Sequence, residues 1–399
     1  MEGLGASEVG DEDRDAIQAL LDRRAQAFLQ GDRAAFLGTV WPPAEGFRSR
    51  QRELFGALHG KGGVGLVSYE LHAEWSRYGD LARPSEVARY EGIASVAIPL
   101  TRERYRLEPS GGGLVEQDQY LTFVKDGNEW FVAADDDLED VGLFTQRNIW
   151  DFTPLRVEVS DNFILAMPAC RDDCPASPEV ILPAAEEAAG AVRERWSLPW
   201  EARVLLIAAA SHEQIAIILQ ATYPVDNYVA FAFWTGEGNA AGPRVILNPR
   251  AFTGVAAERA TSVLTHELLH VAALPWSGPF MPHFVDEGVA QYVQYGGASG
   301  PVADASAASR SDPRVPANHE FYVGTQIEIL QSYQRSLSVV AFLAAEHGPG
   351  SVERFYRRLG RAGDGPGTAR FHLDRALRRV FGFDLRGLER RWASSIGAS

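Results

Sequence analysis

The feature that most constrains this chain is the segment ERATSVLTHELLHVAA, at residues 258–273. Its apolar residues recur every three or four positions, which predicts an amphipathic helix. Within it, His266 and His270 stand four positions apart and therefore lie one turn apart on the same helix face. Their imidazoles can converge on one metal ion, whereas Glu267, rotated by about 100° from His266, reaches the rim of such a site. The segment therefore predicts a metal-binding helix that needs a further ligand from elsewhere in the fold.

A zinc site needs a third protein ligand and leaves a fourth position open for water. The pattern HExxHxxGxxH would supply that ligand from the same segment, but Ala273 and Trp276 occupy the Gly and His positions here. The alternative is a glutamate from a second helix, and Glu287 lies near the start of FVDEGVAQYV, which has helical apolar spacing. Three prolines between the two segments predict a turn that lets the helices lie antiparallel. We therefore expect Glu287 beside the two histidines, with His283 as a competing ligand.

The motifs HELLH and DEGVAQY resemble those of the gluzincin metallopeptidases, specifically the peptidase MA-like domains related to aminopeptidase N. The resemblance covers roughly residues 155–399 and implies a zinc-dependent hydrolase that acts on a peptide or protein substrate. It implies that His266, His270 and Glu287 bind Zn²⁺ and that Glu267 is the general base.

The segment SYQRSLSVVAFLAAEHGPGSVERFYRRL, at residues 332–359, resembles the family's helix that carries a catalytic tyrosine. The match implies that Tyr333 donates to the oxyanion, with Tyr292, Tyr295 and Tyr322 as rivals. Asp286 is expected to cap its helix, with a hydrogen bond to a ligand histidine as the alternative. The glycine-rich motif by which aminopeptidases hold a substrate's free amine is missing, so we expect endopeptidase-like activity.

The N-terminal half has a different pattern. Helical periodicity at residues 15–30 is followed by segments with strand-like composition, at residues 93–100, 102–107, 117–125 and 129–134. The opening DAIQALLDRRAQAFLQGDRAAFL and the closing hairpin YLTFVKDGNEWFVAADDD resemble the nuclear-transport-factor-like, or SnoaL-like, cone. Such cones include enzymes and ligand-binding modules, but we identify no catalytic pair in this half. The acidic run at residues 135–140 lacks the glycine and spacing of a calcium loop and predicts a solvated face.

These patterns predict an α+β fold in three parts: an acidic tail at residues 1–15, the cone at residues 16–150 and a zincin-like domain at residues 151–399. The zincin-like domain is expected to combine a mixed sheet with a mostly helical C-terminal half. Residues 296–318 are rich in Gly, Ala, Ser and Pro, which predicts a long flexible loop.

Charge and hydropathy exclude other classes of protein. The net charge of −15 and the lack of a basic cluster along the sequence disfavour nucleic acid as a partner. No apolar run approaches the roughly 18 residues of a membrane helix, and the N-terminus has no signal-peptide pattern. Cys170 and Cys174 are compatible with a small disulfide or with two free thiols. A zinc site at these cysteines is disfavoured because the chain has no others.

Location and activity each have alternatives. Proteins of the resembled family are often secreted or bound to the bacterial envelope, which implies an extracellular or cell-envelope location, with the cytoplasm as the alternative. Nothing in the sequence specifies an oligomeric state.

One rival to the peptidase hypothesis is a catalytically inactive zincin-fold protein in which the N-terminal cone recognises the ligand. In the other, HExxH occurs by chance and the cone acts alone.

Overall fold

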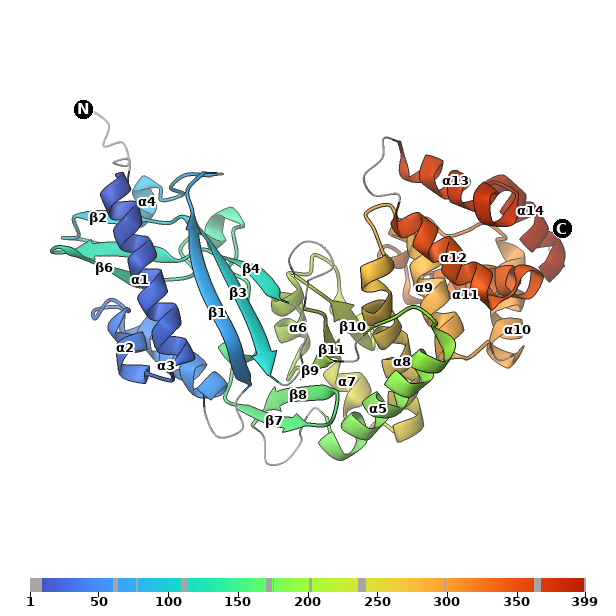
Figure 1. Cartoon of the computed structure of the whole chain (residues 1–399), viewed down its shortest axis with the longest axis horizontal. Helices are drawn as coiled ribbons and strands as arrows, with labels where there is room; N and C mark the ends of the chain where they lie inside the picture. The colour runs from blue at the N-terminus through green and yellow to red at the C-terminus, as the bar shows by residue number, and fades with distance from the viewer. Residues whose placement is uncertain are drawn as a thin grey trace. The chain divides into compact units, whose positions relative to one another are not determined.

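The computed structural model describes residues 9–59, 64–76, 78–108, 114–169, 174, 176–200, 203–235, 242–297, 299–361 and 367–397. The chain divides into two compact units. Unit 1 comprises Met1–Ala176, Arg203–Val225 and Phe233–Thr253, and unit 2 comprises Ser177–Ala202, Asp226–Ala232 and Gly254–Ser399. Helices occur together with small antiparallel and mixed sheets, which confirms the α+β class (Figure 1).

The units do not coincide with the predicted boundary between residues 150 and 151, because much of the chain just after that boundary groups with unit 1. Arg244 gives a physical reason. Its buried guanidinium donates to the Tyr105 hydroxyl at 3.3 Å and to Asn148 Oδ1 at 2.7 Å, and all three residues belong to unit 1. A hydrogen bond of this kind is costly to leave unmade inside a core, so it ties the later strands to the N-terminal elements. The identities of the two predicted domains remain predictions.

The first helix, α1, begins earlier than expected. It spans Asp11–Leu29, so the predicted acidic tail is wrong for residues 11–15, whereas residues 1–8 lie outside the described residues. Three acidic residues occupy its first turn, where negative charge interacts favourably with the helix dipole. The acidic composition that suggested a loose tail is therefore also the composition of a good helix start.

In unit 1, α1 packs along the sheet that contains β1 (Figure 1). That sheet has the strand order β1-β3-β4, and a second antiparallel sheet has the order β2-β5-β6. The bounds of these elements are α2 Arg33–Gly38, α3 Glu45–His59, β1 Gly65–Glu74, α4 Pro84–Val87, β2 Ser95–Ala97, β3 Leu100–Glu108, β4 Val115–Gln119, β5 Thr122–Asp126 and β6 Glu129–Ala134.

Two predicted strands are each divided between the two sheets. Residues 117–125 form the end of β4 and most of β5, and residues 93–100 form β2 and the first residue of β3. In each case the chain passes from one sheet to the other, with a short break in pairing. Local composition does not mark such a break, because the residues on both sides keep the apolar and aromatic character of strands.

The acidic run at residues 135–140 is only partly a solvated face. Asp135 and Asp137 are buried, with 5% and 8% of their surface exposed. Asp135 pairs with Arg147 and Arg50, and Asp137 pairs with Arg89 at 2.8 Å. The prediction was wrong for these two residues because their arginine partners come from distant parts of the sequence.

A mixed sheet follows the junction. The strands of this sheet that belong to unit 1 lie side by side in the order β11-β9-β8-β7. β7 and β8 are antiparallel, whereas β8 pairs with β9 and β9 with β11 in parallel. All five residues of β9 are buried, as expected for an apolar strand covered on both faces. The bounds are β7 Leu155–Val159, β8 Phe163–Pro168, β9 Val204–Ala208, α6 His212–Leu219, β11 Arg244–Leu247 and α7 Pro249–Phe252.

Unit 2 is mostly helical, and its central helices pack in pairs, α5 with α8, α8 with α9, and α9 with α11 (Figure 1). Each of these helices has an apolar buried face. The bounds are α5 Pro178–Arg195, α8 Ala257–Ala273, α9 His283–Gln294, α10 Ser299–Ala308, α11 Gln326–His347, α12 Pro349–Gly360, α13 Ala369–Phe381 and α14 Leu385–Ile396.

The predicted flexible loop at residues 296–318 is partly helical, because it contains α10 and a short 3-10 helix. Alanine favours helices strongly, and α10 packs against α11 with Ser306 Oγ 2.9 Å from Ser338 Oγ. Arg335 of α11 then pairs with both Asp312 and Glu320. The small residues that suggested a loop instead allow the close packing of a helix.

Two further expectations concern membranes and cysteines. Among the described residues, no helix is both long enough and apolar enough to cross a bilayer. Cys174 is disulfide-bonded, whereas Cys170 lies outside the described residues.

Gly288 sets the distance between α9 and α11. A Cβ atom at this position would lie 2.5 Å from the backbone oxygen of Ser336 and 2.7 Å from Val340 Cγ2. A backbone carbonyl inside a helix cannot move aside as a flexible side chain can, so only glycine permits this approach.

We predict that Gly288→Ala destabilises the protein by about 1–3 kcal/mol, because overpacking outweighs the gain of about 1 kcal/mol in helix propensity. The matched control is Gly190→Ala in α5, where an added Cβ meets nothing within 4 Å. This control should stabilise the protein by about 0.5–1 kcal/mol. Chemical denaturation followed by circular dichroism measures both changes, and equal effects of the two variants would contradict the close approach.

Candidate metal centre

The two halves of the sequence motif lie on neighbouring helices of unit 2. His266, Glu267 and His270 lie on α8, and Glu287 lies in the first half of α9. The apolar face of α8 is buried against α5 and α9, and this packing holds the helix in one orientation. The structure therefore brings together the three residues that were predicted as ligands.

The donor atoms of these residues form a compact triangle. His266 Nε2 lies 3.1 Å from Glu287 Oε2 and 3.2 Å from His270 Nε2, and His270 Nε2 lies 3.5 Å from Glu287 Oε2. A tetrahedral zinc ion with bonds of about 2.0–2.1 Å has its ligand atoms about 3.3 Å apart. The triangle therefore has the size of one face of a zinc coordination sphere. Among the described residues, this is the group of histidine, cysteine and acidic side chains that could hold a metal ion.

The site is partly buried, since the three side chains are 11–15% exposed. Burial by itself disfavours the ionised form of Glu287, but the neighbouring charge of His270 and hydrogen bonds from both histidines outweigh it and hold the pKa of Glu287 well below its usual range. A permanently ionised carboxylate beside two imidazoles is a suitable donor set for Zn²⁺.

Asp286 supports the site instead of capping its helix. The residue that caps α9 is Pro282, so the preferred prediction for Asp286 was wrong. Its Oδ2 lies 3.5 Å from His270 Nδ1, and its Oδ1 accepts a hydrogen bond from the Tyr356 hydroxyl at 2.5 Å. A carboxylate on the far nitrogen of a ligand histidine fixes the orientation of the ring, which matches the alternative prediction.

Glu267 lies beside the triangle and outside it. Its carboxylate is 8% exposed, and Oε2 accepts a hydrogen bond of 2.7 Å from the backbone N–H of Ala232 in β10 (Ala230–Phe233). Burial raises the pKa of Glu267, and the positive charge of His266 and His270 opposes this only in part. A carboxylate of raised pKa, held by a backbone amide, is suited to accept and release a proton.

A cavity of about 950 Å³ opens in front of these residues. His266, Glu267 and Tyr333 all line it, together with aliphatic side chains that include Ile329 and Leu330. Burial raises the pKa of Tyr333 well above its usual value, and the charge of Glu287 adds to the effect. Tyr333 therefore stays protonated and can donate a hydrogen bond into the cavity.

The rival residues occupy other places. His283, the first residue of α9, lies outside the donor triangle, and its Nδ1 lies 3.2 Å from the Tyr322 hydroxyl. Tyr295 lines the same cavity as Tyr333, as does Tyr228, which the sequence did not single out. The Tyr228 hydroxyl donates to the Phe321 carbonyl at 2.8 Å.

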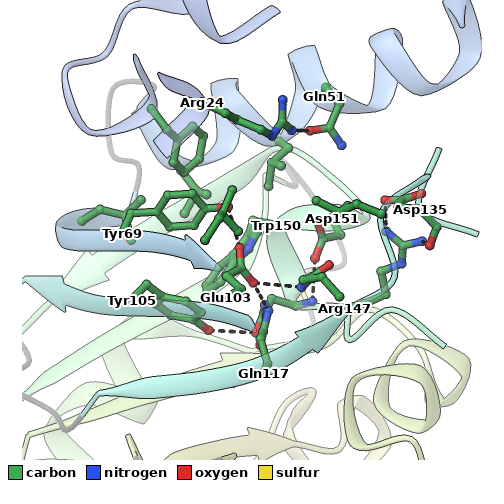
Figure 2. Close-up of a pocket in the computed structure, with 18 residues that line it drawn as sticks. Arg24, Gln51, Tyr69, Glu103, Tyr105, Gln117, Asp135, Arg147, Trp150 and Asp151 are labelled. Atoms are coloured by element: carbon green, nitrogen blue, oxygen red, sulfur yellow. Dashed lines mark hydrogen bonds and ion pairs between the residues drawn. The ribbon is translucent and has the colours of Figure 1, made fainter. Parts of the chain in front are cut away.

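A second polar cavity, missed in the sequence, lies inside unit 1 (Figure 2). Glu103 accepts hydrogen bonds there from the Tyr69 hydroxyl and from the amides of Gln117 and Gln119. Arg24, 4% exposed, hydrogen-bonds Thr39 and Gln51. Burial lowers the pKa of Arg24 to about 10.

Asp151 lines the same cavity, and burial raises its pKa to about 7 despite a hydrogen bond from the Asn148 backbone and the charge of Arg147. A signal for the cavity does exist in the sequence. Glu103 alternates with Tyr105 and Leu107 along β3, so it belongs to the inward face of that strand. For Asp151 no such pattern exists, because it lies in a 3-10 turn whose burial depends on distant elements.

Comparison with protein-family models finds none that matches this chain. A search of curated proteins also finds no match. The chemistry of both cavities is therefore inferred from their geometry.

We predict that the protein binds one Zn²⁺ per chain and that Glu287→Gln, which replaces a charged donor by a neutral amide, weakens binding by more than about 100-fold. Asp286→Asn should weaken binding by about 10–100-fold, because it removes only the support of His270. Competition with a chelator of known affinity measures these changes. Glu258→Gln, an exposed position in the first turn of α8, is the matched control. Unchanged affinity in Glu287→Gln would contradict the ligand set.

We predict that Asp151 makes the protein less stable as pH rises from about 4 to about 7. The native carboxyl holds its proton in this range, whereas the unfolded one releases it, so the free energy of unfolding falls with pH. Asp151→Asn should remove this loss and be more stable than wild type at pH 8 by up to about 4 kcal/mol. Urea denaturation at several pH values measures the difference. The exposed Asp136→Asn is the control, and parallel pH profiles of wild type and Asp151→Asn would contradict the shift.

Proposed function

We propose that this protein is a zinc metallopeptidase, which hydrolyses peptide bonds with Glu267 as general base. The observation that carries the proposal is the triangle of donor atoms from His266, His270 and Glu287, whose sides of 3.1–3.5 Å fit one tetrahedral zinc ion. The position of Glu267 supports catalysis over a purely structural site, because a structural site needs no buried carboxylate beside its ligands.

Zinc, when bound, supplies Lewis acidity, which makes a water molecule acidic near neutral pH and polarises a peptide carbonyl. The Glu267 carboxylate would accept a proton from the attacking water molecule and pass it to the leaving amine. Its raised pKa suits both transfers, since the group can be charged in one step and neutral in the next. The hydrogen bond from Ala232 fixes the carboxylate while it does so.

Tyr333 is the proposed oxyanion donor. It lines the cavity with His266 and Glu267, and its raised pKa keeps the hydroxyl proton in place for donation. His270, held by Asp286, would stay oriented throughout the reaction.

The substrate we propose is an internal stretch of a peptide or protein. Within unit 2, no other described strand pairs with β10, so an extended peptide can add to it by backbone hydrogen bonds. The missing exopeptidase motif agrees with cleavage away from the substrate's N-terminus.

We further propose an extracellular or cell-envelope location, which the disulfide of Cys174 supports because disulfides persist in oxidising compartments.

A second candidate function rests on the polar cavity of unit 1. We propose as the alternative that the zinc site is inactive and that the cavity around Glu103 and Asp151 recognises a small ligand (Figure 2). Three acidic residues and two arginines line this one interior cavity. Burying such groups lowers stability, and they are usually retained for a function. This candidate is favoured if the zinc-loaded protein cleaves no peptide.

We predict that Glu267→Gln keeps one zinc per chain but lowers the rate of peptide hydrolysis by at least about 10²–10⁴-fold, because the amide cannot accept the proton. The measurement is cleavage of casein and of a quenched-peptide library by zinc-loaded protein, with a chelated sample as blank. Glu258→Gln, which makes the same chemical change at an exposed site on α8, should leave the rate unchanged. A Glu267→Gln variant as active as wild type would show that the base is another group.

A further inference from the structure

A cationic cavity lies between α12 and α13 in unit 2, and none of the metal-centre residues lines it. Its volume is about 520 Å³, and its lining residues are Arg358, Arg361, His372, Arg375 and Ala376. Arg358 and Arg361 are three positions apart at the end of α12, and His372 and Arg375 are three positions apart on α13. Residues at this spacing share a helix face, so two packed helices each direct a pair of basic groups into one cavity.

The arginines of this cavity differ from their neighbours in having no carboxylate partner among the described residues. Arg370 pairs with Asp374 at 2.9 Å, and Arg378 pairs with Asp384 at 3.0 Å. Within the part of the chain that the structure describes, no carboxylate lies within 4.0 Å of the guanidinium groups of Arg358, Arg361 and Arg375. Three like charges in one cavity repel each other, and an anion between them would remove this repulsion.

His372 is a buried group that lacks a partner. Its surface is 3% exposed, and its ring stacks on Phe280 with centroids 4.7 Å apart. Nε2 is buried with no hydrogen-bond partner among the described residues. Gly367, at φ +140°, leaves room at this nitrogen, because a Cβ there would lie 3.2 Å from it. His372 is one of the residues that line the cavity, so the missing partner of its nitrogen points to a ligand at this place.

Helix stability explains only part of this arrangement. Arg358 and Arg361 lie at the C-terminus of α12, where a positive charge interacts favourably with the helix dipole. Arg375 lies in the middle of α13, where this effect is weak, and the dipole of α12 gives no reason for the buried nitrogen of His372. A ligand accounts for all four groups.

We propose that this cavity binds a phosphate group, either inorganic phosphate or the phosphate of a small monoester. Each guanidinium presents parallel N–H donors that match two phosphate oxygens, and His372 can add one donor. A tetrahedral anion can meet several guanidinium groups from different directions, whereas a carboxylate is suited to one. The four groups line one cavity between two helices, and a single cavity suits a small phosphate better than the long backbone of a nucleic acid.

The test is isothermal titration calorimetry of the full chain with inorganic phosphate, glycerol phosphate and a nucleoside monophosphate at constant ionic strength, with acetate for comparison. We expect saturable binding of one phosphate group per chain. Tighter binding of a monoester would identify the organic phosphate as the ligand, and binding of inorganic phosphate alone would identify the free ion.

Arg375→Gln and Arg358→Gln should each weaken phosphate binding by at least about tenfold. Arg379→Gln, which removes the same charge from an exposed position of α13 outside the cavity, should leave the affinity unchanged. This comparison also separates the cavity from the metal centre, where an anion could bind to zinc. His372→Phe keeps the stacked ring and should lose affinity without losing thermal stability.

Three results would overturn the proposal. The first is no saturable binding of any phosphate up to roughly 10 mM, well beyond a Kd of about 1 mM. The second is equal affinity in Arg375→Gln and Arg379→Gln. The third is binding of duplex DNA or of anionic lipid vesicles that depends on Arg375 while the small phosphates do not bind.

Discussion

The close packing of α9 against its two neighbours is the constraint on which the metal centre depends. Gly288 brings the backbone of α9 against the Ser336 carbonyl of α11. Adjacent residues of a helix point about 100° apart, so the rotation of α9 that places Gly288 against α11 turns Glu287 towards α8. The Glu287 carboxylate then lies within 3.1 Å of His266 and 3.5 Å of His270. A larger residue at 288 would move the only acidic ligand of the proposed site.

Both units bury ionisable groups at positions where apolar side chains would give a more stable protein. In unit 2, Glu267 and Asp286 are held near the donor triangle by a backbone amide and by a tyrosine hydroxyl. In unit 1, Glu103 receives three side-chain hydrogen bonds, and Arg24 is almost completely buried. Hydrogen bonds compensate the loss of solvation only in part, so such groups are usually retained for chemistry or recognition. This argument supports both the proposed peptidase site and the proposed ligand-binding role of the cavity in unit 1.

Charge is unevenly distributed in this chain. Its net charge is −15, yet residues 349–399 contain eleven arginines and five acidic residues. Most of these arginines are spread over helix surfaces, and some pair with acids of the same helix, as Arg370 does with Asp374. The lining of the cavity between α12 and α13 is different, because it gathers arginines from two helices around one buried histidine. The net charge of the whole chain therefore does not predict whether a single cavity binds an anion.

The sequence by itself determined the helix that carries His266 and His270, the helix that carries Glu287 and the α+β class, because these depend on local periodicity and on residue types at fixed spacing. The alternation of Glu103 with Tyr105 and Leu107 marks an inward strand face that the sequence analysis did not identify. Only the tertiary structure decided that Asp135 and Asp137 are buried, that α10 replaces a loop, that Asp286 contacts His270, and that three arginines line one cavity with His372. The physical reason is that a pKa, an ion pair or a cavity depends on groups far apart in the chain, and no local pattern records which of them become neighbours.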